Sequence, residues 1–446
     1  MANLLIIDGE GTGVALAFRA SQRGHKVRLF IEPSPQSNPN IGAGFEGITK
    51  VQNWVGSTRW ADVIFVCDNN KYLPKLDALK RAGVPIFAPS KKSADLEIKR
   101  GLGMDFLKSH KIDVPEFQIF KSLKEAEKHV WKTNEAFVFK TLGDNEDKSL
   151  SYVGKTPADL IARLQMWQQT GMNPKGDVML QKLVKGVEFS ITGVMGKNGW
   201  LNTKVETFEY KKLMPGNYGP NTGEMGTVAK SVNTSKIFDM MLKPLEEDLL
   251  KLGHVGFCDM NTIIDESGKI WPLEFTNRPG WPIYNLILAG MKNDPVEWMI
   301  DALEGKDTLD VKKEVGICVV IAQPNFPYII EGSEPAPDNP IYGLNSTNIK
   351  HIQPQFVQIK KFPDMDGDKV KIKPMWSTAG EYLAVVTGFG DTVPQASRRV
   401  YKTVDQLSVS NMIVRNDIGK TLNEKQLPEL QKLGFAADWN LDKGNK

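Results

Sequence analysis

Two short motifs carry the side chains best suited to bind a metal ion and an anion. The first is a loop of glycines and a proline, residues 219–226, which surrounds Asn221 and Thr222. The second, about fifty residues later, is an apolar run that ends with Glu274 and is followed by Arg278. A carboxylate at the end of an apolar strand can hold a divalent cation, and an arginine can hold an anion through paired donors. The two motifs therefore indicate a site for both.

A lysine ends another apolar run earlier in the chain. Lys140 follows Phe137, Val138 and Phe139, so on a buried strand its ammonium group would be costly unless it met an anion. A lone lysine in this place is equally well explained as a surface residue of an edge strand. Its position ahead of the two motifs favours the anion-binding interpretation.

Taken in order, and after a lysine-rich middle, these motifs resemble the active site of glycinamide ribonucleotide synthetase, a family of ATP-grasp ligases. The resemblance covers nearly the whole chain, because residues 390–392 and 414–419 repeat the closing motifs of that family. It implies an α/β and α+β architecture: an ATP-grasp fold with a doubly wound N-terminal domain and a β-rich C-terminal domain. It also implies ATP and Mg²⁺ as cofactors.

The resemblance implies nucleotide contacts along the segment between the two lobes of the fold. Residues 181–188 look like the hinge that receives adenine. Gln181 would face the exocyclic amine, the Val184 backbone would face the ring edge, and Glu188 would accept from the ribose hydroxyls. An amide replaces the usual acid at Gln181, and its oxygen still accepts a hydrogen bond. The nucleotide-binding residues implied in this way are Arg100, Lys140, Lys148, Gln181, Lys182, Val184 and Glu188.

Metal ligands follow from the same resemblance. Glu274 would be the principal magnesium ligand, with Asn261 on the neighbouring strand as a second. The family places an asparagine two positions after the glutamate, where this chain has Thr276, with Asn277 adjacent. Asp259 lies on the same strand face as Asn261 and could substitute for it.

The implied catalytic residues surround the place where an acyl group would react. Arg278 would lie beside the reacting phosphoryl and acyl groups, and Lys211 belongs to a basic pair that precedes the glycine-rich loop. Asn221 and Thr222 of that loop would hold the acyl group.

The chain departs from the family pattern mainly on the acceptor side. Residues 281–283 replace the acids that follow the family arginine, and residues 67–70 replace a segment that helps hold a ribosyl phosphate. Loop 143–149 is acidic, and acids beside a triphosphate would repel it. These changes predict weak or absent synthesis of glycinamide ribonucleotide.

The hydrophobic pattern changes twice along the chain, which predicts three domains. Residues 1–95 alternate strands and helices as a small doubly wound domain does. Residues 96–312 would form the ATP-grasp domain, with its nucleotide-binding lobe at about 115–185, and residues 313–446 a strand-rich C-terminal α+β domain.

Local patterns predict particular elements within these domains. Helices are expected at 96–110 and 236–252. The aspartates and glycine of 364–368 lack the full spacing of a calcium loop and predict the solvated tip of a hairpin.

A turn rich in glycine follows the first predicted strand, residues 3–8. It contains Gly9, Gly11 and Gly13 and leads into a helix and a second strand, a βαβ unit. The turn lacks the full spacing of a dinucleotide-binding motif. Two interpretations stay open: a nest of backbone amides for a substrate phosphate, or a tight turn.

Composition limits what can be expected of nucleic-acid binding, disulfide bonds and membrane insertion. The chain has 446 residues, 24% of them charged, with a net charge of +3, so bulk charge argues neither for nor against a nucleic-acid partner. Cys67, Cys258 and Cys318 each lie in an apolar run, which predicts buried free thiols and fits a reducing cytoplasm. No apolar stretch approaches about 20 residues, so we expect no membrane span or signal peptide.

The sequence therefore predicts an ATP-dependent carboxylate–amine ligase with small-molecule substrates, acting as a monomer or homodimer. By analogy it would join glycine to an amine acceptor. Two alternatives stay open. One is a divergent ligase that attaches an amino acid to a modified nucleotide or a DNA base, and the other is a nucleotide-binding protein with little catalysis.

Overall fold

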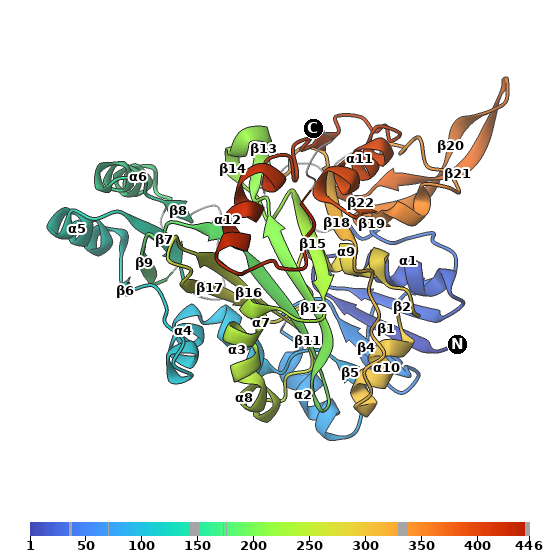
Figure 1. Cartoon of the computed structure of the whole chain (residues 1–446). Helices are drawn as coiled ribbons and strands as arrows, with labels where there is room; N and C mark the ends of the chain where they lie inside the picture. The colour runs from blue at the N-terminus through green and yellow to red at the C-terminus, as the bar shows by residue number, and fades with distance from the viewer. Residues whose placement is uncertain are drawn as a thin grey trace.

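The N-terminal part of the chain is a five-stranded parallel sheet in the order β3-β2-β1-β4-β5 (Figure 1). The structure, a computed structural model, describes residues 1–34, 38–69, 71–142, 151–172, 174, 176–328 and 338–441. The elements are β1 Asn3–Asp8, α1 Val14–Gln22, β2 Lys26–Ile31, β3 Ile48–Lys50, β4 Val63–Val66, α2 Leu73–Arg81 and β5 Ile86–Phe87. The apolar residues of β1 are fully buried, as expected of a parallel strand covered on both faces. The predicted doubly wound sheet is confirmed.

A small lobe follows, built on a four-stranded antiparallel sheet in the order β6-β9-β7-β8. Its elements are β6 Phe117–Phe120, α5 Leu123–Thr133, β7 Phe137–Thr141, β8 Tyr152–Val153, α6 Pro157–Thr170 and β9 Val178–Lys182. Ser122 and Thr156 cap the two helices by accepting from backbone amides. The lobe has a hydrophobic core of its own, centred on Phe139, Leu164 and Trp167, and it stands apart at the left of Figure 1.

Most of the remaining strands form one ten-stranded sheet. Its main path is β10-β16-β11-β12-β15-β18-β22-β19, with β17 paired to β16 and β23 to β18. The strands are β10 Val187–Glu188, β11 Ser190–Gly196, β12 Gly199–Glu209, β15 Gly226–Val232, β16 Gly256–Ile264, β17 Ile270–Thr276, β18 Val315–Ala322, β19 Ile352–Pro354, β22 Tyr382–Gly390 and β23 Ile413–Val414. Because β18 pairs with β15, the predicted boundary at residue 312 falls within one continuous sheet.

Two predicted helices are each broken in two. The segment 96–110 lies in α3 Lys91–Ile98 and α4 Arg100–Ser109, which are separated at Lys99, whose φ of −102° and ψ of 80° are not helical. The segment 236–252 forms α7 Lys236–Met241 and α8 Glu246–Lys251, with a short 3₁₀ turn at Lys243–Leu245 between them. Pro244 lies in that turn and has no amide hydrogen to continue an α-helix.

The remaining elements cover the large sheet or project from it. The helices are α9 Ile283–Gly290, α10 Glu297–Glu304, α11 Val393–Val404 and α12 Leu427–Lys432, and two hairpins are β13 Lys212–Met214 with β14 Tyr218–Asn221 and β20 Val357–Asp366 with β21 Lys369–Thr378. The second hairpin projects at the upper right of Figure 1 and turns at Gly367, as 364–368 predicted. Cys67, Cys258 and Cys318 are buried free thiols, which confirms the prediction. Within the described residues, no helix has the length and apolar character needed to span a bilayer.

Candidate functional site

A cleft of about 1330 Å³ is lined by residues of both the small lobe and the large sheet. It brings together residues that are far apart in the sequence. The predicted site residues that line it are Arg100, Lys140, Gln181, Lys182, Val184, Glu188, Lys211, Asn221, Thr222 and Glu274. Lys148 lies outside the described residues.

Strand alternation explains why Lys140 faces the cleft. On β7 the side chains of Phe137 and Phe139 are buried in the core of the small lobe. Successive side chains of a strand point to opposite faces, so Lys140 projects from the other face of the sheet and lines the cleft.

Residues 183–186 connect the small lobe to the large sheet, because Lys182 ends β9 and Val187 begins β10. Gly186 allows this connection to pass close to β16, since a Cβ there would lie 2.2 Å from the carbonyl oxygen of Ile264. Gln181 is 2% exposed, and its Nε2 has no hydrogen-bond partner among the described residues. A buried amide without a partner is costly, so Gln181 is suited to a polar ligand in the cleft.

Carboxylates from three strands, those of Glu188, Glu209 and Glu274, line the cleft and surround Lys211. Asn261 and Glu274 are cross-strand partners on β16 and β17. The Nδ2 of Asn261 donates to both carboxylate oxygens of Glu209, at 2.9 Å each. Lys211 lies among them, with its Nζ 2.8 Å from Glu188 and 3.1 Å from Glu209.

These charges alter the protonation of the site. Burial alone would lower the pKa of Lys211, but the surrounding carboxylates, above all that of Glu188, raise it well above its usual value. Arg100 pairs with Glu274 in the same way. The carboxylates are therefore balanced by two side-chain cations, which is the charge arrangement that a metal ion and a bound anion would replace.

Asp259 lies beside this group and, like the predicted ligand Asn261, is not among the residues that line the cleft. Burial raises its pKa to about 8, and the nearby carboxylate of Glu209 adds to the shift. The hydroxyl of Thr192 donates to it at 2.5 Å. Burial therefore favours the protonated form of the Asp259 carboxyl at neutral pH.

The hairpin β13–β14 positions Asn221 and Thr222. The backbone amide and the hydroxyl of Thr222 both donate to the carbonyl oxygen of Lys211, at 2.8 Å each. Asn221 pairs with Lys212 across the hairpin. Thr222 thus fixes the backbone from which Lys211 enters the cleft.

Three predicted site residues just after or at the end of β17 do not line the cleft. Thr276 is the cross-strand partner of Asp259. Asn277 is fully buried, and its Nδ2 donates to the carbonyl oxygen of Ser93 at 2.6 Å. The Nε of Arg278 lies 3.1 Å from Glu97. These positions argue against Thr276 and Asn277 as metal ligands.

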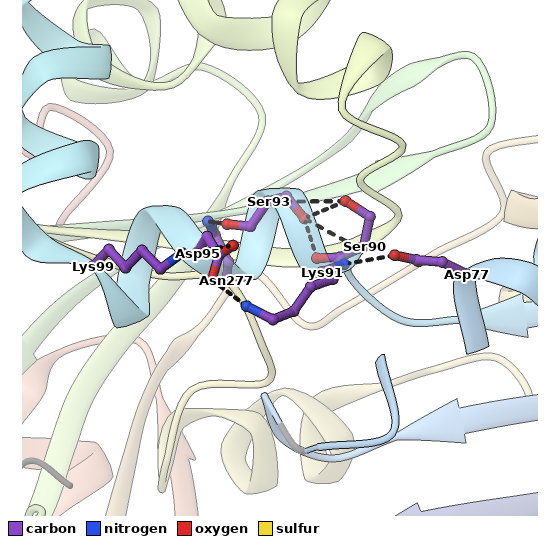
Figure 2. Close-up of polar contacts among 7 residues, drawn as sticks. All are labelled: Asp77, Ser90, Lys91, Ser93, Asp95, Lys99 and Asn277. Carbon is purple, nitrogen blue, oxygen red and sulfur yellow. Dashed lines mark hydrogen bonds and ion pairs between the residues drawn. The ribbon is translucent and has the colours of Figure 1, made fainter. Parts of the chain in front are cut away.

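The residues at and after the end of β17 lie away from the cleft because they pack against α3. The first turn of α3 appears in Figure 2. Ser90 and Ser93 form a capping box that fixes this turn. The carbonyl oxygen of Ser93 accepts a hydrogen bond from the side-chain amide of Asn277. Glu97, one turn further along α3, accepts one from the backbone amide of Asn277 at 2.7 Å. The chain that leaves β17 is therefore held against α3, away from the cleft.

Two residues with clear roles in this geometry were not predicted. Glu209 lines the cleft and joins Lys211 to Asn261. It ends the long strand β12, whose residues Asn202, Thr203, Lys204, Glu206 and Thr207 are polar, so the sequence around it gives a weaker signal than the apolar run before Glu274. Glu97, the partner of Arg278, gives no comparable signal, because it is one acid among several charged residues of a helix.

The chain is similar in sequence to known proteins. A family model described as "Phosphoribosylglycinamide synthetase, ATP-grasp (A) domain" matches residues 101–276. The chain is 26% identical over 445 residues to a phosphoribosylamine–glycine ligase of Neisseria meningitidis serogroup B, covering 94% of this chain and 99% of the relative. A ligase of the same name from Haemophilus influenzae is 27% identical over 451 residues, covering 95% and 99%.

Solved structures show the same fold. The phosphoribosylamine–glycine ligase of Thermotoga maritima superposes with a TM-score of 0.67 at 20% identity, covering 93% of this chain and 100% of the other. An N5-carboxyaminoimidazole ribonucleotide synthetase from Thermotoga maritima gives a TM-score of 0.55 at 15% identity, covering 92% and 99%. Residues 101–276 therefore match an ATP-grasp domain model, and the chain as a whole is similar in sequence and fold to phosphoribosylamine–glycine ligases.

Proposed function

We propose that this protein is an ATP-dependent carboxylate–amine ligase that joins an amino acid, glycine by analogy, to an amine acceptor and releases ADP and phosphate. The observation that carries the proposal is the cleft itself. It brings together the buried amide of Gln181, which has no partner among the described residues, Lys140 of the small lobe, and carboxylates of the large sheet. The similarity to ligases over nearly the full chain favours this function over nucleotide binding without catalysis.

The described residues fit ATP and Mg²⁺. Gln181 and the Val184 backbone would hold the adenine, and Glu188 would accept from the ribose hydroxyls. Mg²⁺ prefers oxygen ligands, which Glu274, Asn261 and Glu209 would supply. When bound, the metal ion would neutralise charge on the phosphates.

The protein's own cations would then change partners. Arg100 and Lys211 are paired with carboxylates in this structure, and those carboxylates would turn to the metal ion. The two side chains, together with Lys140, would be left to face phosphate oxygens. Preorganised cations of this kind stabilise the charge that develops during phosphoryl transfer.

The proposed reaction has two balanced steps. A carboxylate oxygen of the amino acid attacks the γ-phosphorus of ATP, the bond to ADP breaks, and an acyl phosphate forms. The amine nitrogen of the acceptor then attacks the acyl carbon, phosphate leaves with the bonding electrons, and the nitrogen loses a proton. Asn221 and Thr222 would hold the acyl group during both steps.

An ADP-release screen of amino acids combined with amine acceptors tests the proposal. We expect ADP release that needs ATP, Mg²⁺, one amino acid and one amine together. Glu274→Ala is the matched inactive control, since it removes the principal metal ligand and leaves the hinge unchanged. ADP release that is the same with and without amino acid and amine would show an ATPase and reject the ligase function.

A further inference from the structure

The glycine-rich turn after β1 has its backbone amides occupied by a side chain of the same strand. The carboxylate of Asp8 accepts from the amides of Glu10, Gly11 and Gly13 at 3.0, 2.8 and 2.6 Å. Asp8 is 1% exposed. Burial raises its pKa, while the hydrogen bonds from these amides act in the opposite direction.

A second carboxylate accepts a hydrogen bond from the first amide of the turn. The Oδ2 of Asp68, which follows β4, accepts from the amide of Gly9 at 2.8 Å. Their approach is so close that a Cβ at Gly9 would lie 2.1 Å from the same oxygen. Glycine is therefore needed at position 9 to admit the carboxylate of Asp68.

A turn of this kind, between a strand and the N-terminus of a helix, ordinarily offers its amides to a phosphate. Here the amides already donate to two aspartates that are fixed parts of the fold. A phosphate group approaching the turn would find few amide donors and would meet like charge. Of the two interpretations of the turn that the sequence left open, this geometry supports the tight turn.

The neighbouring arginine does not restore an anion site. Arg278 is paired with Glu97 at 3.1 Å. Burial alone would lower the pKa of Arg278, but the carboxylates of Glu97, Glu10 and Asp68 raise it, in that order of effect. Its charge is thus already balanced by three acids, two of them from the loops after β1 and β4.

We propose that Asp68 is a specificity-determining residue: beside a turn whose other amides donate to Asp8, its carboxylate excludes a phosphate group from Gly9, so that an acceptor amine reaching this turn carries no phosphate there. The inference rests on the proposed ligase function and narrows its acceptor class. It separates this protein from an enzyme whose acceptor is a ribosyl phosphate.

A binding experiment tests the inference without turnover. The nucleotide cleft is first saturated with a non-hydrolysable ATP analogue and Mg²⁺, so that phosphate cannot bind there. Ribose 5-phosphate and ribose are then titrated by calorimetry into the wild type, Asp68→Ala and Asp68→Asn. Asp62→Ala is the matched control, because Asp62 also accepts from a backbone amide of this domain, that of Asn3 at 2.7 Å, outside the turn.

We expect the wild type and Asp62→Ala to bind ribose 5-phosphate no more tightly than ribose. Asp68→Ala should bind ribose 5-phosphate at least tenfold more tightly than the wild type does, and Asp68→Asn, which keeps an acceptor for Gly9 but loses the charge, should lie between them. Melting temperatures identify any variant that fails to fold. A wild-type protein that prefers ribose 5-phosphate, or a folded Asp68→Ala with unchanged affinity for it, would overturn the inference. Neither result depends on ADP release, so failure of the ligase function would be seen separately.

Discussion

The side-chain amide of Asn261 donates to both carboxylate oxygens of Glu209, each at 2.9 Å, and thereby holds that carboxylate against the end of the cleft. Asn261 is also the cross-strand partner of Glu274. The two acids therefore share one neighbour, although they lie on different strands. This arrangement makes Glu209 a candidate metal ligand of equal standing with Glu274.

We predict that Glu209→Ala weakens Mg²⁺-dependent ATP binding by roughly tenfold or more, as loss of a ligand or its close support commonly does. Calorimetry with ATP at several Mg²⁺ concentrations measures this. Glu304→Ala is the control, because Glu304 is an exposed acid paired with Lys306 and does not line the cleft. Equal Mg²⁺ dependence in both variants would remove Glu209 from the metal site.

The raised pKa of Asp259 predicts a pH dependence of stability. The folded protein holds this proton up to about pH 8, whereas an unfolded chain releases it near the ordinary value of about 4. Between those values the folded state binds more protons, so the contribution of Asp259 to the free energy of unfolding falls as pH rises.

Asp259→Asn keeps an acceptor for Thr192 and cannot titrate. We therefore expect the difference in unfolding free energy between Asp259→Asn and the wild type to grow from pH 5 to pH 8, by at most about 1.4 kcal/mol per pH unit. Urea unfolding at several pH values measures it. A difference that stays constant over this range would show that Asp259 is already ionised at pH 5.

The sequence predicts that Arg278 lies beside the reacting groups, although in this structure its guanidinium is paired with Glu97 and does not line the cleft. If it contacts the reacting groups during turnover, Arg278→Lys should lower the single-turnover rate by roughly a hundredfold and leave ATP affinity within a few-fold. Glu97→Gln is the control, because it breaks the same ion pair and keeps the guanidinium. A purely structural role would lower the melting temperature of both variants and leave the rate of the folded fraction unchanged.

The residue changes at the expected acceptor site predict weak or absent synthesis of glycinamide ribonucleotide. The expected cause is the altered segments 67–70 and 281–283 together with the carboxylates that occupy the turn after β1. A coupled assay with freshly prepared phosphoribosylamine and glycine measures it. Turnover on the order of 10 per second, typical of enzymes, would contradict this prediction.

The N-terminal sheet was predicted from local patterns, whereas most of the cleft residues were predicted from the resemblance to a known family. The apolar run of β1 and the acid that follows the apolar part of β17 are visible within a few residues. Side-chain direction beyond a strand end is different, because it depends on what packs there. Asn277 and Arg278 turn toward α3, whose serines and Glu97 offer partners that no spacing rule connects to β17.

The contacts of the glycine-rich turn also differ in how far the sequence could predict them. Asp8 directly precedes the glycine turn, and an aspartate there commonly accepts from amides further along the chain, so its capture of the turn could have been foreseen. The contribution of Asp68 could not, because it reaches the turn from a different strand. The hydrogen bonds that Glu209 accepts from Asn261 also join different strands, and no local pattern predicts them.

The central claim is that a carboxylate oxygen of the amino acid attacks the γ-phosphorus of ATP. The most direct measurement follows that oxygen. The amino acid selected by the ADP-release screen is labelled with oxygen-18 in its carboxylate, and the phosphate released during ligation is analysed by mass. The account predicts one labelled oxygen in each phosphate, formed in step with the amide. Amide formation with unlabelled phosphate would contradict it.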